Sequence, residues 1–207
     1  MANAIINEID FTLFYDCDQL RDKKLSRLSD KGKIEWFAKR MEFVFLKPLT
    51  ILFDKSFEEK NSKDGNGTFT IMSFSILLNG VEALGSFLVP LKDKKKNGKY
   101  TSGKNRDCFL EFIKKYMSEW NKNKIPDKLW KNFRNGIAHA FVIENGGIDY
   151  DADSVRFRTT KQGTLEIGPQ AFFKDFQNGL ACFFKDVGSK TDIKRVFLDN
   201  FKEYYPH

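Results

Sequence analysis

The sequence predicts a mainly α-helical domain, a helical bundle that carries one small β-hairpin. Apolar residues recur three and four positions apart in several long segments, which is the spacing of helices that bury one face. Strict alternation of apolar and polar residues is confined to a short region at 148–168. The 207 residues are enough for one domain with a substantial core and few for two, so we expect a single domain spanning 1–207.

The first helix is predicted over residues 33–60, after an N-terminal arm at 1–31 that has no clear periodicity. Pro48 lies near the middle of this helix and should bend or interrupt it, because proline lacks the amide proton and its ring clashes with the preceding turn. A segment rich in Gly, Asn and Asp at 62–67 then predicts a loop. The apolar positions of the helix are Trp36, Phe37, Met41, Val44, Phe45, Leu49, Leu52 and Phe53.

The second helix is predicted over residues 68–89 and ends at Pro90. The stretch from Ile71 to Leu91 is the one segment long enough to suggest a membrane span. It contains Asn79, Glu82 and several Ser and Gly residues, so we expect a buried helix of a bundle and no membrane contact.

Residues 91–105 predict a basic loop, and the net charge of +7 favours an anionic partner. A run of like charges is most often a solvated, mobile loop. The other interpretation is an arm that follows the phosphates of a nucleic acid, and the sequence leaves both open. The lysines of the run are Lys92, Lys94, Lys95, Lys96, Lys99 and Lys104, and the predicted nucleic-acid contacts are Lys94, Lys95, Lys96 and Lys99.

The third and fourth helices are predicted over residues 106–121 and 126–143. Pro126 suits the first turn of the fourth helix, where its missing amide proton costs nothing. Two further helices, at 169–187 and 192–205, complete the chain.

A β-hairpin is predicted between the fourth helix and the last two. Val155 and Phe157 alternate with polar residues on one side of a turn, and Leu165 and Ile167 do so on the other. Ile148 and Tyr150 are candidates for a third strand.

The composition suggests a cytoplasmic protein without metal or cofactor. The three cysteines are far apart, which indicates neither a disulfide framework nor a CxxC metal site, and the N-terminus has no secretory signal. HExxH, P-loop and GxSxG motifs are absent. The 22 Phe fall mostly in apolar-periodic segments, so we expect them in the core rather than as base-stacking platforms.

His139 is the main candidate for acid–base chemistry near neutral pH, because the other histidine, His207, is the terminal residue. At about 100° per residue His139 lies opposite the apolar face of its helix, with Asn135 on its own side and Arg134 about 140° away. Gly136 would allow the close approach of a second backbone, either from a dimer partner or from the same bundle. The alternative is that Arg134 and His139 are a buried structural pair. The residues that define the apolar face are Trp130, Phe133, Ile137 and Phe141.

Arg134, Asn135 and His139 resemble the Rx4–6H signature of the HEPN superfamily, in which arginine, a polar residue and histidine lie on the last helix of an α-helical bundle. The segment Lys128–Ile143 provides the expected helix. The resemblance implies a HEPN-like bundle and a metal-independent endoribonuclease that acts as a homodimer on single-stranded RNA, as in bacterial defence and toxin systems. It also implies an antitoxin or regulatory partner.

In that scheme His139 transfers the proton, Arg134 stabilises the phosphorane charge and Asn135 holds the histidine or the phosphate. Some toxin members have tyrosine two residues after the histidine, where this chain has Phe141, so no phenol role is expected. Two alternatives stay open: a catalytically silent HEPN module that binds RNA, a nucleotide or a protein, and a purely structural adaptor.

Glu82 is an additional catalytic candidate, because a carboxylate in an apolar helix is unusual. The other interpretation is that its side chain reaches solvent or pairs with an arginine, with Arg134 as the first partner to consider.

Overall fold

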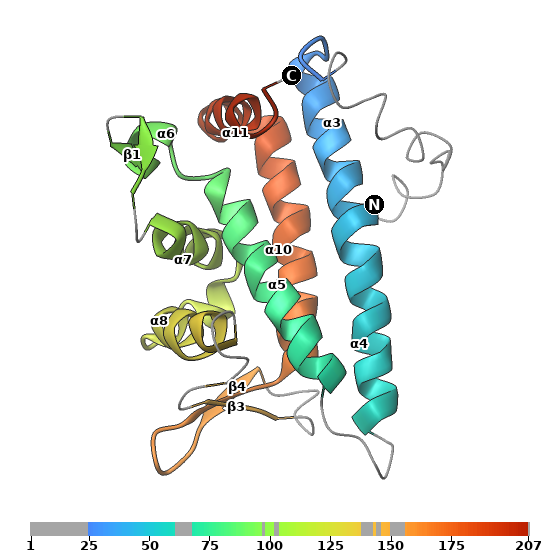
Figure 1. Cartoon of the computed structure of the whole chain (residues 1–207), viewed down its shortest axis with the longest axis vertical. Coiled ribbons are helices and arrows are strands. Elements are labelled where there is room, and N and C mark those ends of the chain that lie inside the picture. Colours follow the sequence, from blue (N-terminus) through green and yellow to red (C-terminus); the bar gives the residue numbers. More distant parts are fainter. Residues whose placement is uncertain are drawn as a thin grey trace.

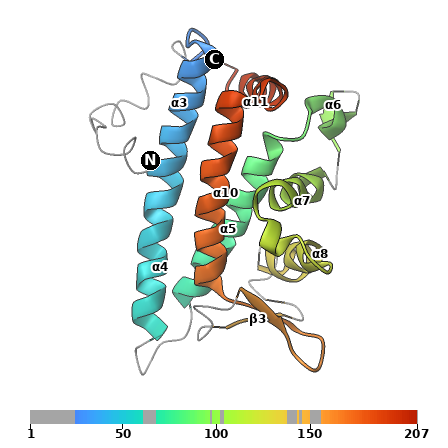
Figure 2. The same cartoon turned by 180° about the vertical axis from the view of Figure 1, so that it is seen from behind.

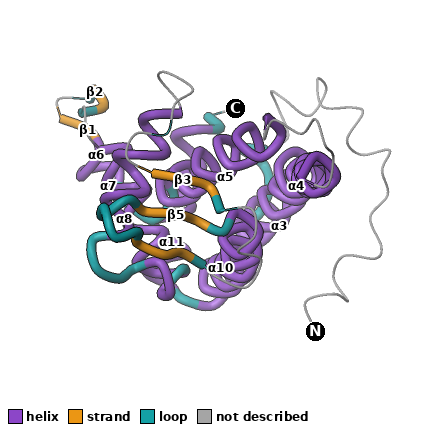
Figure 3. Tube along the Cα trace, turned by 90° about the horizontal axis from the view of Figure 1, so that it is seen from below, coloured by secondary structure: helices purple, strands orange, loops and turns teal. Residues whose placement is uncertain are grey.

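The structure is a computed structural model, and it describes residues 25–60, 68–96, 98–101, 104–137, 143, 146–149 and 156–206. In these residues the helices form a bundle, and a three-stranded sheet covers its lower end in Figure 1. Figure 3 shows the same sheet from below. The prediction of a mainly α-helical fold is confirmed. The predicted N-terminal arm lies outside the described residues up to residue 24.

The first predicted helix is one long rod (Figure 1). The rod consists of α3 (Asp30–Arg40), η2 (Met41–Leu46) and α4 (Lys47–Lys60). Ser29 begins it, because its hydroxyl accepts a hydrogen bond of 3.1 Å from the backbone N–H of Gly32.

Pro48 does not break this rod. The preceding segment η2 is a π-helix, and the N–H of Lys47 bonds to the carbonyl of Glu42, five residues back. A wider turn before a proline gives room to the ring that would clash in an α-helix. The expected interruption is therefore a local change of helix type, and α4 continues the line of α3.

The second helix, α5 (Thr68–Ser86), lies in front of α10 in Figure 1 and contacts α4, α7 and η4. Its window Phe69–Ser86 is long and apolar enough to cross a membrane, but half of it is buried inside the protein. Because that burial comes from packing against other helices, the prediction of a bundle helix is confirmed. At Gly85 the contact is closest, since an added Cβ would lie 1.8 Å from the carbonyl oxygen of Cys108 on α7.

The predicted basic loop has regular structure over most of its length, so this prediction is wrong. It begins with α6 (Leu91–Lys94) and continues into the strands β1 (Lys95–Lys96) and β2 (Lys99–Tyr100), which pair antiparallel. The lysine run is thereby attached to the helical body instead of forming a free arm.

The third and fourth predicted helices are confirmed with changed ends. They comprise α7 (Lys104–Tyr116), followed by the short η3 (Ser118–Trp120), and α8 (Ile125–Lys128), which continues into the π-helix η4 (Leu129–Asn135). Pro126 lies in the first turn of α8, as expected. Helical structure extends to Ile137, and the predicted end near residue 143 lies beyond this described segment.

The sheet contains β3 (Gly146–Ile148), β4 (Phe157–Thr159) and β5 (Leu165–Ile167) in the order β3-β5-β4. The predicted hairpin is confirmed, because β4 and β5 pair antiparallel. The strand at Ile148 pairs parallel with β5, whereas Tyr150 and Val155 are outside the described residues.

The last two helices, α10 (Pro169–Ser189) and α11 (Thr191–Tyr204), agree with the prediction. In Figures 1 and 2, α10 lies between the α3–α4 rod and α5. The core around it is rich in phenylalanine, which confirms the expectation for this residue type. The fully buried phenylalanines are Phe53, Phe74, Phe109, Phe112, Phe133, Phe172, Phe176, Phe183, Phe197 and Phe201.

Candidate functional site

The candidate site lies where η4 packs against α5. The side chains of Leu129 and Phe133 are fully buried and fix η4 to the core. Phe133 contacts the ring of Phe74 on α5 edge to face, with 5.9 Å between the ring centroids. Arg134 follows Phe133 directly, so this anchoring determines where its side chain begins.

The side chain of Arg134 pairs with Glu82 of α5. Its Nε atom donates a hydrogen bond of 2.7 Å to Oε2 of Glu82, and Nη2 lies 2.6 Å from the same oxygen. Both side chains are only 16% exposed. A charge-assisted pair at this depth is screened less than one on the surface. The sequence-based alternative that Glu82 pairs with an arginine, Arg134 first, is thereby confirmed.

Trp130 forms the second contact of Arg134. The guanidinium carbon lies 4.8 Å from the centroid of the indole ring, one helical turn away on η4. A cation over an aromatic face is attracted by the ring quadrupole. Glu82 and Trp130 together hold the guanidinium in place before any ligand binds.

Burial raises the pKa of Glu82, and this effect exceeds the opposing effects of the positive charge of Arg134 and of its hydrogen bond. The carboxylate is therefore held in its charged form chiefly by Arg134. An anion that attracted Arg134 away would leave Glu82 more ready to take up a proton.

Asn135 and His139 complete the sequence motif. Asn135 is half-buried, and no side-chain hydrogen bond joins it to another described residue. His139 lies two positions after the last described residue of this helix, so its placement beside Arg134 and Asn135 stays a prediction. Phe141 also lies outside the described residues.

The π-helical form of η4 changes the helical-wheel argument for these residues. A π-helix forms i→i+5 hydrogen bonds, so each residue turns by less than the ~100° of an α-helix. The predicted angle of about 140° between Arg134 and His139 assumed a regular α-helix, and it stays a prediction because His139 is outside the described residues. Short π-helical segments occur frequently at functional sites.

The four lysines predicted to contact nucleic acid have different environments. Lys94 is 2% exposed, so the expectation that it belongs to a solvated run is wrong. Lys95 pairs with Glu203 of α11, and Lys96 is exposed. The side chain of Lys99 is outside what the structure describes. Among the three of these lysines whose side chains the structure describes, Lys96 is the one with the exposure expected of a phosphate-tracking arm.

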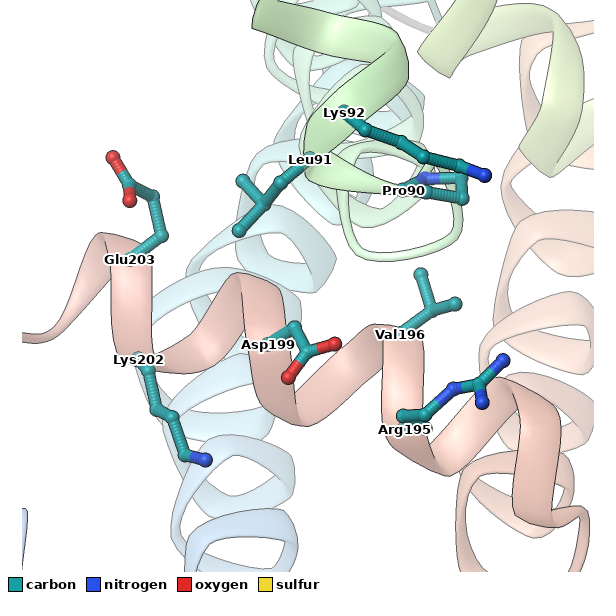
Figure 4. A pocket seen from close by; sticks show the side chains of 8 residues that line it. All are labelled: Pro90, Leu91, Lys92, Arg195, Val196, Asp199, Lys202 and Glu203. Carbon is teal, nitrogen blue, oxygen red and sulfur yellow. The ribbon is translucent and has the colours of Figure 1, made fainter. Parts of the chain in front are cut away.

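Two hollows lie near α5, α6 and α11. One, of about 300 Å³, adjoins Glu82 and is lined also by Lys94, Lys104 and Cys108. A larger one, of about 600 Å³, lies between α6 and α11 (Figure 4). In Figure 4 the side chains of Lys202 and Glu203 point to opposite sides of α11. The smaller hollow is the one next to the motif.

Sequence reasoning missed two features of the site. Trp130 was assigned only to the apolar face, although its position four residues before Arg134 is the spacing at which helical side chains meet. The burial of Lys94 had no local signal, because it depends on Asn200 and Tyr204, more than 100 positions away. In the described part of the chain no group of three or more His, Cys, Asp or Glu could hold a metal ion.

Comparisons with known proteins identified no relative of this chain. The searches against protein-family models, curated proteins and solved structures found no match to this chain. The resemblance to the HEPN superfamily therefore rests on the sequence motif of Arg134, Asn135 and His139.

Proposed function

We propose that this chain is a metal-independent endoribonuclease of the HEPN type that acts as a homodimer on single-stranded RNA, in a cytoplasmic defence or toxin system. The observation that carries the proposal is the part-buried Arg134, held between Glu82 and Trp130 on the helix that bears Asn135. An arginine fixed in this way is preorganised to meet a phosphate.

The proposed reaction is an in-line attack of the RNA 2′-hydroxyl on the adjacent phosphorus. The 2′-oxygen–phosphorus bond forms as the bond to the 5′-oxygen breaks, which leaves a 2′,3′-cyclic phosphate. His139 of one protomer accepts the hydroxyl proton, and His139 of the second protomer donates a proton to the leaving oxygen. Arg134 stabilises the charge on the phosphorane with the N–H groups that Glu82 does not use.

An exposed apolar strip supports the dimer. Met72 and Ile76 on α5 are 48% and 37% exposed, and Val44 and Ile51 on the neighbouring rod are also exposed. Contiguous exposed apolar surface is typical of an interaction site. Ile76 precedes Glu82 by six residues on α5, which is about 9 Å along a helix axis, so a second copy seated on Met72 and Ile76 would lie near the candidate site.

The second candidate function is a catalytically silent module that binds RNA, a nucleotide or a protein. The specific observation in its favour is the Arg134–Glu82 pair, because a carboxylate already neutralises the guanidinium that the reaction needs. A structural pair would keep the same geometry without cleaving anything.

Cleavage of end-labelled single-stranded RNA in EDTA distinguishes these functions. The wild-type protein should cleave and leave 2′,3′-cyclic phosphate ends, and His139→Ala and Arg134→Gln should each be inactive. Lys131→Ala is the matched control, because Lys131 is exposed on the same helix, η4, and should retain full activity. Circular dichroism checks that each variant is folded.

Three outcomes would contradict the proposed mechanism: cleavage that survives in His139→Ala, cleavage that requires Mg²⁺, or no cleavage by a folded wild-type dimer. If the wild-type protein binds RNA without cutting it, the silent module is the better description. Loss of activity in Lys131→Ala would show that the assay reports a general defect of η4.

A further inference from the structure

Lys94 is a buried ammonium group that forms no ion pair with a carboxylate of the described residues. Its Nζ atom donates hydrogen bonds to the carbonyl of Ser86 at 2.8 Å, to the hydroxyl of Tyr204 at 2.7 Å and to Oδ1 of Asn200. These three acceptors take all the N–H groups of a lysine, and all are neutral. No carboxylate of the described residues forms an ion pair with Lys94.

The surroundings fix Lys94 in this position. The amide nitrogen of Asn200 donates to the carbonyls of Val89 and Val196 at 3.1 and 2.9 Å, which turns its oxygen towards Lys94. The hydroxyl and the backbone N–H of Thr101 both donate to the carbonyl of Lys94. A buried charge is costly unless a counter-charge lies nearby, so the rigid placement of this ammonium calls for an anion.

The hollow of about 300 Å³ beside Glu82 provides the space for one. It is lined by Lys94 and Tyr204 and also by Lys104 and Asn105 in the first turn of α7. This volume is at the lower end of the range for small-ligand sites, about 300–1,000 Å³. The N-terminal end of a helix adds a partial positive charge.

Suitable donors face this space from two elements. Tyr204 accepts a hydrogen bond from Lys94, so its own hydroxyl proton remains to be donated elsewhere. The side chain of Asn105 is exposed and makes no hydrogen bond to another described residue. Lys104 pairs with Asp107 at 3.0 Å, but both side chains are well exposed, and such surface pairs are weak and exchange easily.

The other polar groups of the hollow do not cancel its positive charge. Glu82 would repel an anion, but Arg134 neutralises its carboxylate through both contacting nitrogens. Burial raises the pKa of the Cys108 thiol to about 11, so this group is uncharged near neutral pH. The positive charge of Lys94 therefore remains in excess.

We propose that this hollow is a phosphate-binding pocket. Tyr204, Asn105 and Lys104 donate hydrogen bonds to the phosphate oxygens, and Lys94 provides the buried counter-charge behind the hydroxyl of Tyr204. The pocket is distinct from the Arg134–Asn135–His139 motif, although Glu82 borders both.

The test is calorimetric titration with inorganic phosphate at an ionic strength held constant with NaCl. The wild-type protein should bind phosphate, and Tyr204→Phe should bind it about tenfold more weakly, because one hydrogen bond to a charged group is lost. Tyr204→Phe keeps the ring that packs on Phe87, so the variant should fold. Lys94→Met should abolish binding, whereas Lys185→Met, at an exposed position of α10, should leave it unchanged.

Phosphate that gives no heat above the NaCl control, or equal affinity in Tyr204→Phe and the wild type, would overturn the proposal. Equal loss of binding in Lys185→Met would overturn it too, because the effect would then come from general surface charge.

A second titration identifies the source of the phosphate. A deoxytrinucleotide lacks the attacking 2′-hydroxyl and stays intact, so it can be compared with and without a 5′-phosphate. Tighter binding of the phosphorylated form assigns the pocket to the end of a nucleic acid, and equal binding assigns it to free phosphate. Both titrations measure binding and not cleavage, so failure of the cleavage proposal leaves this result unaffected.

Discussion

Burial changes the chemistry of the Cys108 side chain. Its thiol is buried, and loss of hydration raises its pKa to about 11, while the positive charge of Lys94 acts in the opposite direction. At pH 8 roughly one thiol in a thousand is then ionised. Since the thiolate is the reactive form, Cys108 should react with a disulfide reagent far more slowly than the exposed Cys182.

A Cys17→Ser background tests this, because Cys17 lies outside the described residues. One thiol should react rapidly in the native protein at pH 8, and the second only after unfolding in urea or slowly as the pH rises towards 11. Cys182→Ser should remove the rapid phase. Rapid reaction of two thiols in the native protein would contradict the burial of Cys108.

The residues of the site differ in how far their sequence context predicted their role. Glu82 was identifiable because it is the one charged residue of an otherwise uncharged helix. A carboxylate in such a helix is expected to pair with a positively charged side chain from a neighbouring element. Lys94 lies among other lysines, and local sequence cannot distinguish the one whose side chain turns inward. Its burial depends on α11, which packs against α6 only in the folded chain.

Gly85 determines how closely α5 and α7 approach. An added Cβ would lie 1.8 Å from a backbone oxygen of α7, which cannot move aside like a flexible side chain. Gly85→Ala should therefore destabilise the protein by about 1–3 kcal/mol, even though alanine favours a helix by up to about 1 kcal/mol over glycine. Urea unfolding followed by circular dichroism measures the change.

Gly188→Ala is the matched control, because Gly188 is also helical and an added Cβ there would meet no atom within 4 Å. Alanine at this position should be neutral or stabilising by up to about 1 kcal/mol. If Gly85→Ala were as stable as Gly188→Ala, the close contact between the two helices would be refuted.

Periodicity predicted the helices well, because each buries an apolar face along its length. It could not predict that Met41–Leu46 and Leu129–Asn135 are π-helical, since the choice between i→i+4 and i→i+5 bonds depends on packing and on Pro48. The third strand was expected from Ile148, but its parallel pairing with β5 follows from the path of the chain.

At the scale of the whole molecule, the exposed strip on α5 predicts the oligomeric state. The double change Met72→Asp with Ile76→Asp places like charges against one another across a two-fold contact and should convert a micromolar dimer into a monomer. Sedimentation velocity measures this directly. RNA cleavage should fall as the dimer is lost, because the proposed site uses a histidine from each protomer.

Gln177→Asp with Asn178→Asp is the control, since it adds the same charge at exposed positions of α10. This variant should remain a dimer. A wild-type protein that sediments as a monomer, or a Met72→Asp, Ile76→Asp variant that remains a dimer, would exclude the strip as the interface.

Because the exposed strip of Met72 and Ile76 on α5 carries no charge, ionic strength should have two opposing effects on RNA cleavage. Each chain carries a net charge of +7, so two copies repel, and added salt should strengthen dimerisation by screening that repulsion. The same salt weakens RNA binding, because phosphate contacts depend on counterion release. Cleavage measured near the dimer dissociation constant should therefore pass through a maximum as NaCl is raised. At protein concentrations far above that constant, only the decline should remain.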